Sequence, residues 1–156
     1  MKRLSSIAFA AFALFLAAGP AASADKSKGT AAEATAMVEK AIAHIKKAGR
    51  DKAFADFNRK DGGFTDRDLY VVVYDLKGKV LAHGANPKMI GKDVLDLRDN
   101  DGKYFVKERV EMMAKPGAKG WQDYKFMNPV TMAIEPKSMY LMRFEDVIVG
   151  CGIYKG

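Results

Sequence analysis

A lysine on an apolar strand is the most informative chemical group in this sequence. Strand alternation places Met139 and Leu141 on the same side as Lys137. Burying an ammonium group among apolar side chains is costly unless an anion or a carboxylate side chain meets it. Lys137 therefore either contacts an anionic ligand in a pocket or pairs with Glu135 or Asp123 at the surface. Its spacing alone does not decide between the two.

Four further side chains offer donors suited to a small carboxylate: Tyr124, Trp121, His83 and Arg98. Tyr124 and Trp121 belong to the strand predicted before Lys137, and His83 ends a predicted hairpin. Arg98 lies at the far end of the lid that follows this hairpin. A phenol, an indole, an imidazole and a guanidinium all donate hydrogen bonds, and a charge-assisted bond contributes roughly 1.5–3 kcal/mol. Together with Lys137 they form a candidate carboxylate site.

Nucleophilic catalysis finds little support in the sequence. The two histidines, His44 and His83, lie in unrelated predicted elements, and the one cysteine, Cys151, lies in an apolar strand. No serine occupies a strand–turn–helix elbow, and no glycine-rich loop could cradle a phosphate. We expect no enzymatic activity and no cofactor.

Metal binding is also a poor explanation of the sequence. Counted around Gly102, Asp99, Asp101 and Glu108 match the third, fifth and twelfth positions of an EF-hand loop. Leu97 would then hold the first position, where it cannot bind calcium, so we interpret the acidic residues as helix caps. The nine methionines are too dispersed for a copper site and are expected to fill the core.

A central hairpin over residues 68–84 must position these groups. Two apolar runs flank a short polar turn, and Gly78 can adopt the left-handed conformation that such a turn requires. The first run is apolar on both faces, which predicts a strand in the middle of a sheet, covered on both sides.

The remaining elements surround this hairpin. A long amphipathic helix is predicted to begin at Ala31 and end at Gly49, and a short helical turn follows it. Residues 86–97 lack strand alternation and are predicted to form an ordered lid whose apolar residues join the core. A second helix is predicted over residues 102–113, with capping residues at 99–101.

Three strands are predicted at the end of the chain, at about residues 121–126, 137–144 and 147–154. Their short links favour antiparallel pairing. The predicted fold class is therefore α+β. A five-stranded antiparallel sheet would carry the long helix on one face, with the lid and short helix over a pocket on the other.

The first 24 residues have the features of a secretory signal peptide. Lys2 and Arg3 precede an apolar run over residues 4–18, and residues 22–24 are small. The run is shorter than the roughly 20 residues that span a bilayer. We therefore expect cleavage after Ala24 and a periplasmic protein, although an uncleaved anchor stays open.

The mature part is expected to be one domain. Residues 25–30 are predicted to be a flexible lead-in, and residues 31–156 to form the domain itself. Because the sequence ends just past the last predicted strand, we expect a free-standing exported protein. Loss of Lys2 and Arg3 with the signal peptide would lower the formal charge from +7 to +5, a modest excess, and no nucleic-acid partner is expected.

Seven short segments, taken in order, resemble the single Cache domain of the second type, an extracytoplasmic sensor module of bacterial chemoreceptors and histidine kinases. The segments are residues 70–75 with Gly78, 80–83, 91–93, 99–103, 120–124, 136–140 and 150–154. The resemblance covers residues 31–156. It implies a PAS-like fold in which a long N-terminal helix lies behind an antiparallel sheet and a small ligand binds on the other face.

The resemblance also implies a ligand class and a set of contacts. Family members commonly bind short carboxylates such as acetate, propionate, lactate or pyruvate. By motif position, the residues that would contact the ligand are Lys137, Tyr124, Trp121, His83 and Arg98.

Three further positions bear on the pocket and its surroundings. Gly84 replaces the usual proline after the histidine, which is expected to loosen the lid entrance. Met127 stands where the family often has an aromatic residue or proline. Tyr140, three residues after Lys137, is expected to face the helix.

We therefore expect a periplasmic sensor module that binds a short-chain carboxylate and signals through a membrane receptor or histidine kinase. A homodimer through the N-terminal helix follows by analogy with the family. The alternative is a structural or interaction module whose pocket is vestigial.

Overall fold

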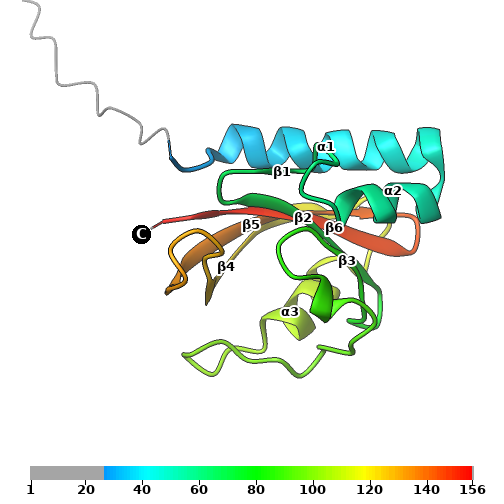
Figure 1. The fold of residues 1–156 in the computed structure, drawn as a ribbon. Helices are drawn as coiled ribbons and strands as arrows, with labels where there is room; N and C mark the ends of the chain where they lie inside the picture. The colour runs from blue at the N-terminus through cyan, green and yellow to red at the C-terminus, as the bar shows by residue number, and fades with distance from the viewer. Residues whose placement is uncertain (1–26, 156) are drawn as a thin grey trace, which may run out of the picture.

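The computed structural model describes residues 27–155, which form helices and one antiparallel sheet whose strands differ in length (Figure 1). The helices are α1 (Ala31–Ala48), α2 (Arg50–Phe57), the 3-10 helix η1 (Pro87–Met89) and α3 (Phe105–Met112). The strands are β1 (Thr65–Asp66), β2 (Leu69–Asp75), β3 (Val80–His83), β4 (Lys119–Met127), β5 (Ile134–Phe144) and β6 (Val147–Tyr154). The predicted signal peptide, residues 1–24, lies outside the described residues. None of the helices described is long and apolar enough to cross a bilayer.

Helix α1 begins and ends where the sequence predicts, because both ends have capping residues. The Thr30 side chain accepts a hydrogen bond from the Glu33 backbone N–H, and Glu33 accepts one from the Thr30 backbone N–H. This reciprocal pair satisfies two donors that the first helical turn leaves unpaired. Gly49 ends the helix with φ of 82°, a conformation that favours glycine.

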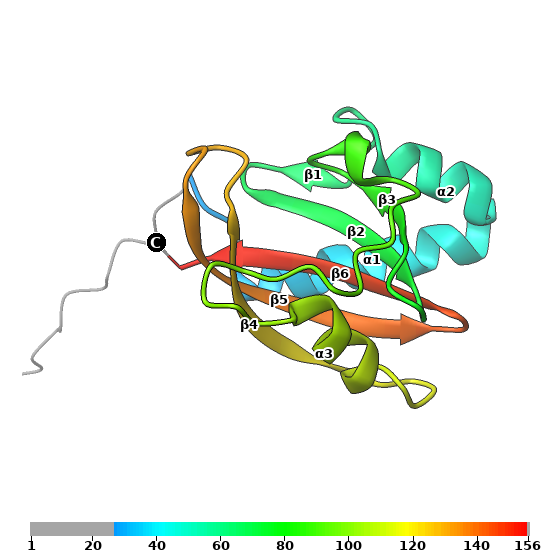
Figure 2. The ribbon, with the colours of Figure 1, turned by 90° about the horizontal axis from the view of Figure 1, so that it is seen from below.

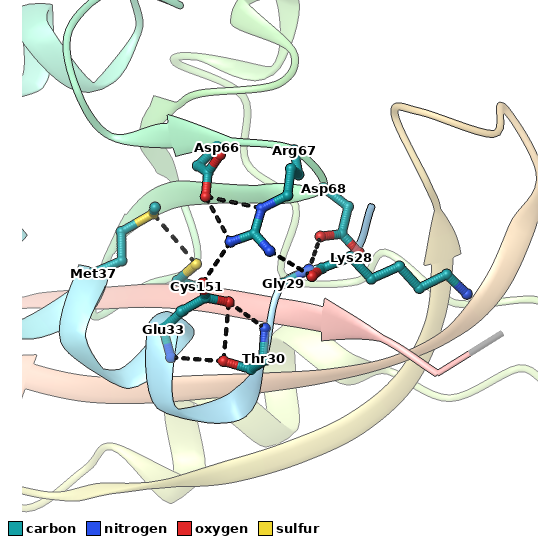
Figure 3. Close-up of polar contacts among 9 residues, drawn as sticks. All are labelled: Lys28, Gly29, Thr30, Glu33, Met37, Asp66, Arg67, Asp68 and Cys151. Atoms are coloured by element: carbon teal, nitrogen blue, oxygen red, sulfur yellow. Dashed lines mark hydrogen bonds and ion pairs between the residues drawn. The ribbon is translucent and has the colours of Figure 1, made fainter. Parts of the chain in front are cut away.

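Residues 28–30, predicted as part of a flexible lead-in, are held against the β1–β2 turn (Figure 3). The Gly29 N–H donates to Asp68 Oδ1 at 2.6 Å, and Arg67 Nη1 donates to the Lys28 carbonyl at 2.6 Å. Arg67 also pairs with Glu33 at 2.7 Å. The prediction of a flexible segment was wrong for these residues. The buried Asp68 side chain accepts a hydrogen bond from a backbone N–H that would face water in a free segment.

The sheet places the first long strand beside the last. Its order is β1–β2–β6–β5–β4, and β3 pairs with β2 as the predicted hairpin partner. Strand β2 is thus in the middle of the sheet, as its two apolar faces predicted, and Gly78 in the hairpin turn has φ of 89°. The predicted α+β fold class is confirmed. The two-residue β1 is an additional strand, giving six in place of the predicted five.

The two faces of the sheet carry separate cores. Helix α1 and helix α2 cover one face, which we call the helix face (Figure 1). Helix α3 and the lid, residues 86–97, lie over the other, which we call the lid face, as the view from below shows (Figure 2). Tyr140 packs in the helix-face core, as predicted. Met139 and Leu141 pack in the lid-face core together with Phe105 and Val106 of α3.

The lid is tied to the hairpin through its second half. The Gly91 N–H donates to the Val80 carbonyl at 2.8 Å, and the Val94 N–H donates to the Gly78 carbonyl at 3.1 Å. Val94 is buried, but Ile90 is 38% exposed, so the prediction that it joins the core was wrong. The backbone bonds fix the path of the lid, and its apolar side chains contribute less than expected.

Helix α3 begins three residues later than predicted and is not capped by the acidic cluster. Its N-cap is Tyr104, which makes no side-chain cap bond. The Asp99 carboxylate instead accepts hydrogen bonds from the backbone N–H groups of Asp101, Lys103 and Lys125. The predicted cap was wrong because Asp99 organises its own loop and joins that loop to β4.

Candidate functional site

Lys137 lies on the lid face of β5 and is only 1% exposed. Its Nζ donates hydrogen bonds to the Tyr70 hydroxyl at 2.8 Å and to the Tyr154 hydroxyl at 3.1 Å. The ammonium also lies over both rings, 4.0 Å and 4.4 Å from their centroids. The alternative of a surface ion pair is not what the structure shows, because Glu135 and Asp123 bond to other groups.

Within residues 27–155 no carboxylate forms an ion pair with Lys137. Burial therefore dominates its titration and lowers its pKa from 10.5 to about 7. The ammonium loses hydration on folding and regains only two neutral oxygen acceptors and two aromatic faces. A carboxylate brought to this point would supply the missing counter-charge.

Gly152 on β6 makes the burial of Lys137 possible. A Cβ atom at this position would lie 2.6 Å from Lys137 Cε and 2.9 Å from the Ser138 carbonyl oxygen. Both approaches are closer than van der Waals contact allows. The lysine stem thus occupies the space that a side chain on the neighbouring strand would fill.

Two adjoining cavities lie next to this cluster. The inner cavity has a volume of about 10 Å³, space for about one water molecule. It lies between the sheet and α3 and is lined by Tyr70, Val72, Tyr74, His83, Met89, Val94, Leu97, Phe105, Val106, Tyr124, Phe126 and Met139. The outer cavity, about 310 Å³, is lined by Tyr70, His83, Ala85, Asn86, Phe126, Met127, Pro129 and Met132. The two share the side chains of Tyr70, His83 and Phe126, and Lys137 lies behind Tyr70.

His83, predicted to contact the ligand from the end of the hairpin, lines both cavities. Its ring stacks on Tyr70 with centroids 5.1 Å apart, and Nδ1 accepts a hydrogen bond from the Asn86 N–H at 3.0 Å. Burial and the nearby Lys137 lower the pKa of His83 from 6.5 to about 4. The imidazole is therefore neutral at physiological pH, with the proton on Nε2 because Nδ1 accepts.

Tyr124, the second of the predicted donors, is buried on the lid face. It lines the inner cavity, stacks on Phe105 with centroids 4.6 Å apart and directs its hydroxyl toward the Met139 sulfur at 3.9 Å. Burial raises its pKa well above the usual value, so the hydroxyl keeps its proton and can donate.

Trp121 and Arg98 do not line either cavity, which corrects two of the predicted contacts. Trp121 is 39% exposed and lies on the helix face, where its ring contacts Tyr140 at a centroid distance of 5.3 Å. Trp121 lies three positions before Tyr124, an odd spacing, so the pleat of β4 turns the two side chains to opposite faces. Arg98 is exposed, with its guanidinium 4.0 Å from the centre of the Tyr104 ring.

The sequence reasoning missed two side chains of the site and a second buried cation near it. Tyr70 and Tyr154 hold the ammonium, and the Tyr154 hydroxyl also donates to the Met127 carbonyl at 2.7 Å. Arg109 of α3 is fully buried on the same face of the sheet. Strand alternation could have found Tyr70, and helical spacing could have found Arg109, which lies four residues from both Phe105 and Met113.

The class of protein follows from the match of its sequence to a known family, with which the fold agrees. The sequence matches the family Single Cache domain 2 over residues 18–156, and the chain belongs to this family. It is thus a Cache sensor domain, related to the extracytoplasmic ligand-binding domains of chemoreceptors and histidine kinases.

Two relatives of the chain are named as a chemotaxis protein and a sensor histidine kinase. The chain is 32% identical over 91 residues to the methyl-accepting chemotaxis protein McpP of Pseudomonas putida, covering 57% of this chain and 16% of that protein. It is 32% identical over 90 residues to the sensor histidine kinase MctS of Rhizobium johnstonii, covering 56% of this chain and 19% of that protein. The chain therefore spans less than a fifth of the length of either relative.

Solved structures confirm the fold. A methyl-accepting chemotaxis protein from Vibrio parahaemolyticus aligns with a TM-score of 0.68 at 22% identity, covering 79% of this chain and 86% of that one. The periplasmic sensor domain of a chemotaxis protein aligns with a TM-score of 0.60 at 26% identity, covering 78% and 88%. A Cache chemosensory domain described for carboxylic acid recognition aligns with a TM-score of 0.63 at 22% identity, covering 78% and 86%.

Proposed function

We propose that this domain binds a short-chain carboxylate, of the acetate, propionate, lactate or pyruvate class, in the periplasm. The observation that carries the proposal is the buried Lys137 ammonium, which has hydroxyl acceptors but no ion-pair partner among the described residues. A carboxylate would supply the counter-charge, and the hydroxyl of Tyr70 and the Nε2–H of His83 are further donors beside the cavities. A related Cache domain described for carboxylic acid recognition supports this class of ligand.

The domain would report occupancy rather than transform its ligand. His83 is the one histidine that lines either cavity, and Cys151 is buried on the helix face, with its pKa raised by burial to about 12. A thiol that keeps its proton is a poor nucleophile. We propose a membrane chemoreceptor or histidine kinase as the recipient of the signal, by analogy with McpP and MctS, and a homodimer through α1 as the assembly.

The test is calorimetry and thermal denaturation of the protein with acetate, propionate, lactate and pyruvate. At least one acid should bind and raise the melting temperature, because a ligand that binds only the folded state stabilises it. Lys137→Met should weaken that binding roughly 10- to 100-fold, the effect of losing one charge-assisted bond of 1.5–3 kcal/mol. Lys88→Met, at an exposed lysine of the lid, is the matched control and should leave binding unchanged.

A second candidate is an interaction module whose pocket no longer binds a ligand. The small inner cavity and four exposed apolar side chains on or beside the β4–β5 loop favour it: Met127, Val130, Met132 and Ile134. Under this alternative no acid would bind, and Lys137→Met would leave any partner association unchanged. Binding that depends on Lys137 would exclude it.

A further inference from the structure

A second buried cation lies on the lid face and has no role in the site described so far. Arg109 of α3 is 0% exposed. Its Nε donates to Gln122 Oε1 at 3.1 Å, but Nη1 and Nη2 have no hydrogen-bond acceptor among the described residues. Leaving charged donors unsatisfied in the interior costs more than leaving a neutral group unpaired.

Aromatic rings surround the guanidinium, together with the hydroxyl groups of Tyr74 and Tyr124. Its Cζ lies 4.9 Å from the centre of the Tyr74 ring, 5.2 Å from Tyr124 and 5.4 Å from Phe105. All three rings line the inner cavity. Cation–π contact stabilises a desolvated guanidinium, but it leaves the N–H groups in the plane of the fork available for an oxygen. Arg109 is therefore held in place with its strongest donors unused.

The two cations flank opposite ends of the inner cavity. Lys137 lies against Tyr70, and Arg109 lies against Tyr74. These tyrosines are four residues apart on one strand, and their side chains point to the same face of the sheet. No ion pair joins either cation to a carboxylate in residues 27–155. Neither cation lines the inner cavity directly: its walls are the tyrosines that contact the two cations and apolar residues such as Val72 and Met139.

We propose that the ligand carries two negative groups, with Lys137 binding one and Arg109 the other, so that a short dicarboxylate is the preferred ligand. This inference rests on the proposed carboxylate site and names its substrate class. A guanidinium fork binds a carboxylate through two parallel N–H···O bonds, which satisfies both orphaned nitrogens at once. The apolar middle of the cavity suits the methylene carbons between two acid groups.

The closed inner cavity is too small for such a ligand, so binding requires movement. Met89 and Leu97 of the lid close the inner cavity, and the larger outer cavity adjoins it at Tyr70 and His83. Residues 91–94 of the lid are held to the hairpin by backbone hydrogen bonds from Gly91 and Val94. The ligand would therefore enter from the outer cavity and displace the first half of the lid.

Succinate and butyrate are the decisive probes, because they have the same number of carbons and differ in the second carboxylate. Both are titrated calorimetrically at about pH 6, where the Lys137 ammonium is charged. The wild-type protein should bind succinate at least tenfold more tightly than butyrate. Arg109→Met should remove this preference and leave butyrate affinity within about threefold, whereas Lys137→Met should weaken both acids tenfold or more.

Two outcomes would overturn the inference. Butyrate or propionate could bind with dependence on Lys137 while succinate binds no better, which would leave the proposed function intact and remove the second charge. Arg109→Met could also leave the succinate preference unchanged. Arg109→Lys, which keeps the charge but lacks the fork, covers a failure of the methionine variant to fold, and it should lose most of the preference. If no acid binds at all, the proposed function itself fails.

Discussion

The two faces of the sheet are built from the same strands and both carry an apolar core, but they differ in the charged groups that they bury. On the helix face, residues such as Val38, Val71 and Val149 pack into an apolar core. On the lid face, the buried charged groups Lys137 and Arg109 lie among tyrosines and a neutral histidine. The alternation of a strand allows this division, because successive side chains belong to different environments.

The difference indicates a division of labour between stability and binding. Burial of apolar surface on the helix face stabilises the fold, and each fully buried large side chain contributes roughly 1.5–3 kcal/mol. The two cations on the lid face are a net cost in the unliganded protein, since neither has a counter-charge. Substitutions on the two faces should therefore separate stability from binding.

The largest expected effect is on the helix face. Phe57 is 0% exposed and meets Phe64 edge-on with centroids 4.6 Å apart. Phe57→Ala should lower the free energy of unfolding by roughly 3–5 kcal/mol, measured by urea denaturation, and leave the carboxylate affinity of the folded protein unchanged. The counterpart is Phe126→Ala, which removes a half-buried ring that lines both cavities. It should cost less stability and weaken binding, and a loss of affinity in Phe57→Ala would break the comparison.

The pH dependence of stability should reveal the cost of the Lys137 ammonium. Its pKa is about 7 in the folded protein and 10.5 in the unfolded chain, so the unfolded chain binds more protons between these values. Stability should therefore rise with pH across this window, by a few kcal/mol in total. Lys137→Met should flatten this rise and be more stable than the wild type near pH 7. An identical pH profile in both proteins would show that the lysine is hydrated in the folded state.

His83 should also make stability depend on pH, with a smaller effect and at acidic pH. Its folded pKa of about 4 lies below the usual 6.5, so the unfolded chain takes up the proton first as the pH falls. Stability should decrease from pH 6.5 to 4 by up to about 3 kcal/mol. His83→Asn keeps an acceptor for the Asn86 N–H without a titrating group. Its profile should be shallower than that of the wild type, and equal slopes would contradict a buried, neutral imidazole.

Trp121→Ala should have the smallest effect on binding. The side chain is 39% exposed on the helix face and contacts Tyr140. Its loss should lower the free energy of unfolding by about 1 kcal/mol and leave carboxylate affinity unchanged in calorimetry. Tyr124→Leu, three residues along the same strand, should weaken binding. If the tryptophan variant also loses affinity, the assignment of the two faces of β4 is wrong.

The fold could be predicted from the sequence because its periodicities are strong. The helix from Ala31, the hairpin around Gly78 and the last two strands all repeat apolar residues at the spacing of their element. Strand β1 was missed because two residues are too few to show any alternation. The cap of α3 was misassigned because Asp99 can bond to whichever backbone donors its loop presents.

The site could be predicted only in part, for two separate reasons. Trp121 was placed in the pocket by its motif, although its three-residue spacing from Tyr124 already contradicted that placement. Arg109 was missed because a charged residue on the inner side of a helix is usually taken for surface. Whether a buried cation has a partner depends on tertiary contacts between α3 and β4, and no local pattern reports those.

Gly152 lines neither cavity, yet its lack of a side chain determines where the Lys137 ammonium lies. An alanine at this position would press on Lys137 Cε and force the ammonium from between its two tyrosines. If the domain binds acids as proposed, a single methyl group at position 152 would weaken that binding by displacing the ammonium. Divergence at position 152 among relatives would then mark lineages whose response to acids has been lost.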